Sequence, residues 1–89
     1  MKQYNVEYDP HVLKKFSKLD TSVLKRIKAW IDKNLEGCEN PRLHGKALQG
    51  EWYGHWRYRI GDYRLIAKIF DDKVIIFIVK IDKRGDVYN

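Results

Sequence analysis

Cysteine and long apolar runs are scarce in this sequence, and each scarcity excludes a class of protein. The single cysteine, Cys38, excludes an internal disulfide and a cysteine-rich zinc site. The longest apolar run, residues 74–79, is far shorter than the roughly 20 residues of a transmembrane helix. Residues 1–6 lack the apolar segment of a signal peptide. We therefore expect a cytoplasmic protein with no membrane partner.

Acidic residues are also few: 12 Asp and Glu stand against 18 Lys and Arg, for a net charge of +6. Such a basic chain favours a polyanionic partner, and charge alone does not choose among RNA, DNA, an acidic lipid surface and an acidic protein. The length of 89 residues and the hydrophobic fraction of 44% predict a single domain, residues 1–89, with a modest core.

The first half of the chain has the pattern of one short strand and two helices. Polar and apolar residues alternate over residues 3–8, which is typical of a strand. Asp9 and Pro10 predict the start of a helix over residues 10–19, with Leu13, Phe16 and Leu19 as its apolar stripe. A second helix begins after Asp20 or Thr21 and ends near residue 37, a glycine. Its apolar face is formed by Val23, Ile27, Trp30, Ile31 and Leu35.

The second half predicts a loop over residues 38–51 and then strands over residues 54–60, 63–70 and 73–81. Gly61 and Asp62 form a two-residue hairpin turn between the first two of these strands. The order is β-α-α-β-β-β. We therefore expect an α+β fold in which an antiparallel sheet has the two N-terminal helices packed on one face.

The hairpin over residues 55–68 carries the strongest functional signal. A two-residue turn pairs Ile60 with Tyr63. It therefore predicts five further cross-strand pairs: Arg59 with Arg64, Tyr58 with Leu65, Arg57 with Ile66, Trp56 with Ala67, and His55 with Lys68. Like charges opposite each other weaken a sheet, so this pairing has no structural benefit. Guanidinium groups bind phosphate through two oxygens at once, which makes an arginine-rich face a candidate phosphate site.

Aromatic side chains surround this hairpin. Trp56, Tyr58 and Tyr63 fall on its apolar face and are expected in the core, whereas the sequence leaves Trp52 and Tyr53 open between packing and base stacking. His55 is either an acid or base near neutral pH or an ordinary polar residue of the strand.

Several segments together resemble the RelE toxins of the RelE/ParE superfamily. They are residues 4–9, 14–20 and 48–50, the run Trp56-Arg57-Tyr58-Arg59-Ile60-Gly61-Asp62-Tyr63-Arg64-Leu65-Ile66, and the ending Lys83-Arg84-Gly85-Asp86-Val87-Tyr88. The resemblance covers essentially the whole chain. It implies a toxin of a type II toxin–antitoxin system that cuts mRNA in the ribosomal A site, without a cofactor or metal. It also implies a RelB-like antitoxin as partner, with operator DNA bound only through the toxin–antitoxin complex.

The resemblance assigns five catalytic residues: Arg57, Arg59, Arg64, Arg84 and Tyr88. Five further residues are candidates for binding RNA: Lys14, Lys15, Lys18, His55 and Lys68. Well-studied RelE toxins have lysines where this chain has Arg57 and Arg59. Arginine is a poor proton acceptor at neutral pH, so His55 and Tyr88 are the candidates for proton transfer.

Two other functions remain open at this point. A ParE-like chain has the same fold but poisons DNA gyrase. A non-catalytic basic module would bind RNA or its antitoxin without cutting RNA.

Overall fold

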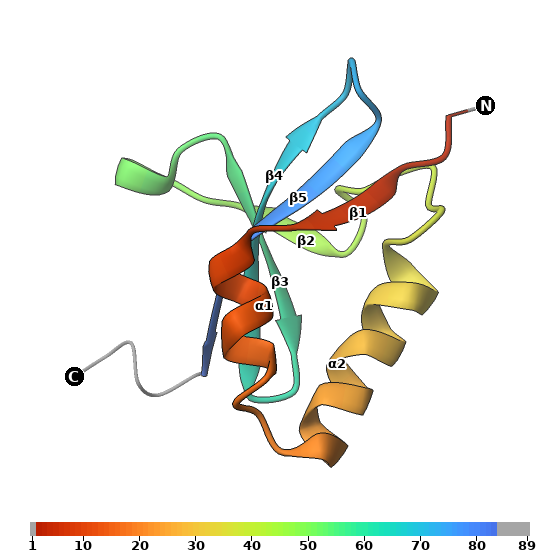
Figure 1. Ribbon diagram of the computed structural model, residues 1–89. Helices are drawn as coiled ribbons and strands as arrows, with labels where there is room; N and C mark the ends of the chain where they lie inside the picture. Colours follow the sequence, from red (N-terminus) through yellow and green to blue (C-terminus); the bar gives the residue numbers. More distant parts are fainter. Residues whose placement is uncertain (1, 84–89) are drawn as a thin grey trace.

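In the computed structural model of the protein, which describes residues 2–83, five strands form one sheet with the order β1-β5-β4-β3-β2. The strands are β1 (Asn5–Tyr8), β2 (Gly45–Ala47), β3 (His55–Ile60), β4 (Tyr63–Phe70) and β5 (Ile75–Lys83). β1 runs parallel to β5, and every other neighbouring pair is antiparallel. The predicted α+β fold with an antiparallel meander is confirmed (Figure 1).

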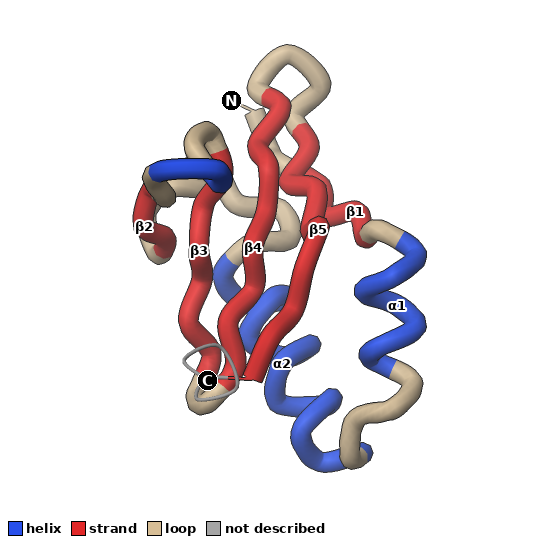
Figure 2. The backbone as a smooth tube through the Cα atoms, turned by 90° about the vertical axis from the view of Figure 1, so that its left-hand side faces the viewer, coloured by secondary structure: helices blue, strands red, loops and turns tan. Residues whose placement is uncertain are grey.

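The helices α1 (Pro10–Phe16) and α2 (Thr21–Asn34) begin where the sequence predicts. The carboxylates of Asp9 and Asp20 accept hydrogen bonds from the backbone N–H groups of His11 and Ser22, respectively. Figure 2 shows α2 behind the sheet and α1 beside β5, following the edge strand β1. Neither helix within residues 2–83 is long and apolar enough to cross a membrane.

The core lies between the helices and the sheet. Ile27, Ile31 and Leu35 are buried from the helical side, as predicted, and Tyr58 and Leu65 are buried from the sheet. Within residues 2–83, neither α1 nor α2 covers the other face of the sheet, which we call the open face (Figure 2). The face toward the helices therefore carries the core that stabilises the domain.

The prediction for the first helix is wrong in two details. α1 ends at Phe16 rather than at residue 19, because the N–H groups of Lys18 and Leu19 bond three residues back and tighten the chain into turns. Val12 rather than Leu13 is buried beside Phe16, and Leu13 is 51% exposed.

The last strand begins and ends two residues later than predicted, at Ile75 and Lys83. Val74 has a φ of 56°, a left-handed conformation that cannot continue a strand. The first strand of the hairpin begins at His55 rather than residue 54 because Gly54 has a φ of 92°.

Within the segment predicted as a loop, residues 45–47 form the short strand β2 at the edge of the sheet. Gly45 pairs with Tyr58, and a Cβ at Gly45 would lie 2.9 Å from the Tyr58 ring. β2 therefore depends on a glycine that lets the chain approach a buried aromatic ring.

The Tyr58 hydroxyl gives the clearest test of this packing. The hydroxyl is buried and donates to the Pro41 carbonyl, which anchors the chain leading into β2. We expect Tyr58→Phe to lower the free energy of unfolding by about 1–2 kcal/mol, because the Pro41 carbonyl loses its buried partner. Urea denaturation measures the change. Tyr53→Phe is the control, since the Tyr53 ring is 78% exposed, and an equal loss in both variants would contradict this account.

Candidate functional site

The site is built on the β3–β4 hairpin, and all the predicted pairs are confirmed. Arg59 lies opposite Arg64, Arg57 opposite Ile66, and His55 opposite Lys68. Tyr58 and Leu65, which alternate with these residues, are completely buried. Arg57, Arg59 and Arg64 therefore share the open face, and none of them points into the core.

Neighbouring strands add two charged residues beside the arginines. Lys46 of β2 pairs with Arg57, and Asp82 of β5 pairs with Arg64. Asp82 is held by lysines on two elements: its carboxylate oxygens lie 3.6 Å from the Lys15 Nζ and 3.4 Å from the Lys80 Nζ. The site thus combines a cationic face with one carboxylate at its β5 side.

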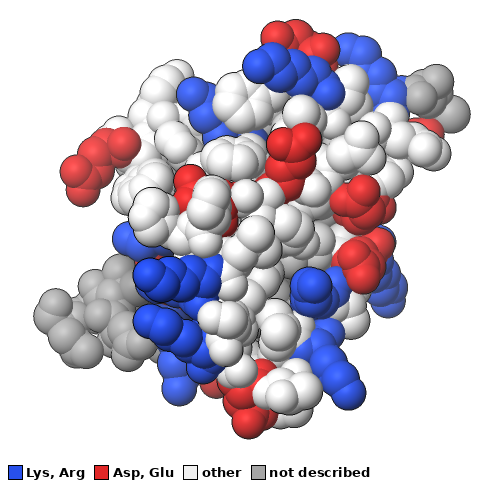
Figure 3. Space-filling model, viewed as in Figure 1, with Lys and Arg blue, Asp and Glu red and all other residues white. Residues whose placement is uncertain are grey.

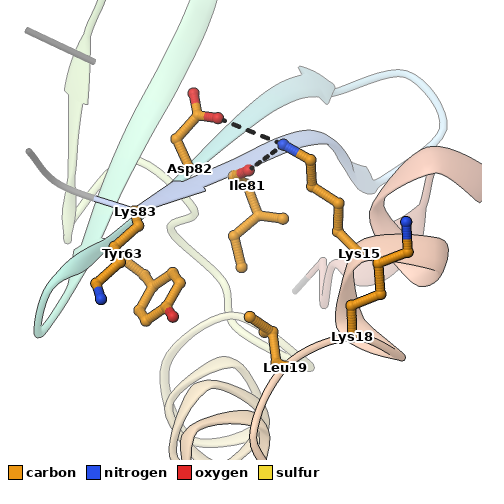
Figure 4. Close-up of a pocket in the computed structure, with 7 residues that line it drawn as sticks. All are labelled: Lys15, Lys18, Leu19, Tyr63, Ile81, Asp82 and Lys83. Atoms are coloured by element: carbon orange, nitrogen blue, oxygen red, sulfur yellow. Dashed lines mark hydrogen bonds and ion pairs between the residues drawn. The ribbon is translucent and has the colours of Figure 1, made fainter. Parts of the chain in front are cut away.

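Lys15 connects α1 to this side of the sheet. Its Nζ also donates to the Ile81 carbonyl at 3.3 Å, so the ammonium spans the exposed edge of β5 (Figure 4). Lys15 and Lys18 line a cavity of about 380 Å³ together with Leu19, Tyr63, Ile81, Asp82 and Lys83. Figure 3 shows basic side chains gathered on the α1 side of the molecule. Lys14 is exposed on α1 as well.

Two predicted RNA-binding residues, Lys68 and His55, lie opposite each other on the hairpin and contact aromatic rings. The Lys68 ammonium lies over the Phe70 ring, 5.4 Å from its centroid, toward the far end of β4. The His55 ring makes an edge contact with Trp52, and its Nδ1 is buried, so this nitrogen is not accessible to a ligand. If His55 exchanges a proton with a substrate, it must do so through Nε2.

Arg84 and Tyr88 lie outside the described residues, so their predicted roles remain predictions. Within residues 2–83, no three His, Cys, Asp or Glu side chains are grouped closely enough to hold a metal ion. Cys38 is half-buried, and this burial raises the pKa of its thiol, which makes a reactive thiolate unfavourable at neutral pH.

Arg42 makes contacts within the fold, although it carries the same charge as the arginines of the site. Its guanidinium binds both Asp71 carboxylate oxygens, at 3.2 and 2.9 Å, and lies over the Trp56 ring. Asp71 also accepts from the Tyr4 hydroxyl at 2.7 Å. These hydrogen bonds, that of Arg42 above all, lower the pKa of Asp71.

Sequence reasoning missed Lys46, Lys80 and Asp82 as neighbours of the arginines. Lys46 was missed because β2 was not recognised. Lys80 and Asp82 depend on the register of β5, which shifts at the irregularity between Ile66 and Ala67 of β4. The alternation of side chains after residue 79 indicates which residues of the last strand share a face, but it does not reveal this shift of register.

Comparison with known proteins agrees with this architecture. Residues 6–88 match the family described as the ParE toxin of the type II toxin–antitoxin system, parDE. The mRNA interferase toxin RelE of Escherichia coli K12 is 31% identical over 90 residues, which cover 97% of this chain and 90% of that protein.

Two solved complexes contain chains with the same fold. The RelBE2 toxin–antitoxin complex of Mycobacterium tuberculosis matches with a TM-score of 0.84 and 28% identity, covering 97% of both chains. The archaeal RelE–RelB complex of Pyrococcus horikoshii matches with a TM-score of 0.74 and 28% identity, covering 93% of this chain and 97% of that one. Because the family match and the RelE match both span nearly the whole sequence, the chain belongs to the ParE toxin family of type II toxin–antitoxin systems and is a toxin of the RelE type.

Proposed function

We propose that the protein is a metal-independent endoribonuclease that cuts mRNA in the ribosomal A site and thereby stops translation in the cytoplasm. The observation that carries this proposal is the direct pairing of Arg59 with Arg64 on the open face, with Arg57 beside them. The kinship with an mRNA interferase supports the same reaction class.

The arginines bind the scissile phosphate. In the reaction the 2′-oxygen bonds to phosphorus, the bond to the 5′-oxygen breaks, and the proton of the 2′-hydroxyl is replaced by one delivered to the leaving oxygen. The products are a 2′,3′-cyclic phosphate and a 5′-hydroxyl. Negative charge grows on the phosphoryl oxygens during this step, and fixed guanidinium groups stabilise it most where it is greatest.

Proton transfer needs other groups, since the guanidinium of Arg57 or Arg59 does not release a proton at neutral pH. Arg84 is proposed to stabilise the leaving oxygen or donate toward it, and Tyr88 to orient the 2′-hydroxyl or stack on a base. His55 Nε2 is the remaining candidate base. The ribosome contributes by holding the mRNA in a shape that aligns the attacking oxygen with the bond that breaks.

Three lysines in and just after α1 are proposed to contact ribosomal or messenger RNA phosphates. Lys14 and Lys15 belong to α1 and Lys18 to the turn that follows it, and Lys15 and Lys18 lie next to β5, which suits contacts beyond the scissile group. A RelB-like antitoxin is the proposed inhibitor, since toxins of the same fold are found in complexes with RelB. Operator DNA would be bound through that complex rather than by the toxin alone.

Removal of single arginines tests the phosphate site. We expect Arg64→Ala, and separately Arg57→Ala, to reduce the rate of A-site cleavage about 10²- to 10³-fold, the cost of losing one preorganised donor. Primer extension on mRNA bound to purified ribosomes measures the cut. Lys33→Ala on α2 is the charge control and should cleave normally. Unchanged cleavage in both arginine variants would show that the scissile phosphate does not bind on the open face.

The nucleophile is tested on the RNA. A single 2′-deoxynucleotide immediately 5′ of the cleaved bond should abolish cleavage there, because the attacking hydroxyl is missing. Mass spectrometry of the all-ribose substrate should find the 2′,3′-cyclic phosphate. Cleavage next to a deoxynucleotide would show that water attacks instead.

A second candidate function follows from the family match, whose description names ParE toxins. A ParE-like toxin would inhibit DNA gyrase and leave mRNA intact. We expect no inhibition of gyrase-catalysed supercoiling at toxin concentrations that stop translation. Gyrase inhibition with uncut mRNA would establish the ParE-like function. If the toxin neither inhibits gyrase nor cuts mRNA, the non-catalytic binding module is the function that remains.

A further inference from the structure

The chain folds back over the open face immediately before β3. The short 3₁₀ helix η1 (Gly50–Trp52) lies between two glycines with positive φ, Gly50 at 68° and Gly54 at 92°. This turn places the Trp52 ring 5.2 Å from the His55 ring, centroid to centroid, at an angle of 87°. The Lys80 Nζ from β5 lies 5.4 Å from the Trp52 centroid.

These residues enclose a hollow of about 300 Å³ that opens to solvent. Its lining consists of Glu51, Trp52, His55 and Lys80, which we call the Trp52 hollow. Two aromatic rings form walls, a carboxylate supplies two acceptor oxygens, and an ammonium supplies several donors. A flat aromatic ligand with polar edges matches this combination.

Stability does not account for the arrangement. The tryptophans Trp30 and Trp56 pack against the buried core, whereas Trp52 stands apart from it on the open face. The Nδ1 of His55 is buried with no hydrogen-bond partner among the described residues. A buried polar atom without a partner costs free energy, so the position of this ring calls for a reason other than packing.

The hollow adjoins the arginines. His55 precedes Arg57 by two residues on β3 and shares its face, a separation of about 7 Å along a strand. Lys80 pairs with Ile66, the residue that also pairs with Arg57, so Lys80 and Arg57 lie in one row across the sheet. The separation of about 7 Å between His55 and Arg57 is close to the distance between successive phosphates in an extended RNA strand, so one nucleotide can reach both places.

We propose that the Trp52 hollow binds one nucleobase of the RNA whose phosphate the arginines hold. The base contacts the Trp52 ring, Lys80 donates to a ring nitrogen or carbonyl of the base, and Glu51 accepts from an exocyclic amino group. This assignment rests on the ribonuclease function proposed above and adds to it a base-reading contact, separate from the phosphate contacts that carry no sequence information.

The test pairs a protein change with an RNA change. Cleavage at subsaturating toxin is measured on purified ribosomes with mRNAs that carry one abasic nucleotide, moved in turn through the A-site codon and its neighbours. We expect Trp52→Ala to slow cleavage of the intact mRNA about tenfold, and Trp52→Phe to restore most of the rate. One abasic position should slow the wild-type protein by the same factor and should not slow Trp52→Ala any further.

Controls separate this contact from folding and from the parent function. Tyr53→Ala removes an adjacent exposed ring and should cleave as the wild type does. Lys80→Met keeps the Trp52 ring but removes the donor to the base. The same abasic position should therefore slow Lys80→Met less than it slows the wild type, which tests the proposal even if Trp52→Ala folds poorly. If the wild type cleaves, but every abasic position slows the wild type and the variants by the same factor, the hollow binds no base. If the wild type does not cleave, the ribonuclease function and this inference both fail.

Discussion

The two-residue turn at Gly61 and Asp62 fixes the register of β3 against β4, and the site depends on that register. Because side chains alternate along a strand, a slip of one residue on β3 would bury Arg57 and Arg59 and expose Tyr58. Gly61 adopts a φ of 56°, which this short turn requires and which a glycine accepts without strain. One local conformation therefore brings residues from both strands to the same face.

The pairing of Arg59 with Arg64 opposes this hairpin, so the opposite face must stabilise it. Directly behind the arginines, Tyr58 and Leu65 form a fully buried pair, and the Tyr58 ring also packs against Trp30. Burial of such side chains is worth more than the roughly 1 kcal/mol or less that like charges cost across a sheet. The domain can thus hold mutually repelling cations in place, which is the preorganisation that phosphate binding requires.

The sequence predicted what is local and missed what depends on distant contacts. Every pair of the β3–β4 hairpin follows from turn length and alternation, and so does the shared face of the three arginines. The strand β2 could not be predicted in the same way, because residues 45–47 have no alternation and pair only where Gly45 meets Tyr58. The neighbours Lys80 and Asp82 depend on the shift of register between β4 and β5, and the place of Trp52 depends on a turn that returns the chain to the open face.

Asp82 shows how the separate parts of the open face are joined. A carboxylate beside an arginine weakens phosphate binding at that point, yet this one contacts Lys15 of α1 and Lys80 of β5 at once. Lys80 in turn lies over the Trp52 ring. One acidic side chain therefore links the helix, the arginine pair and the Trp52 hollow, and it limits how far the two lysines can spread into solvent. The open face is better understood as a connected arrangement of charges than as a uniformly basic surface.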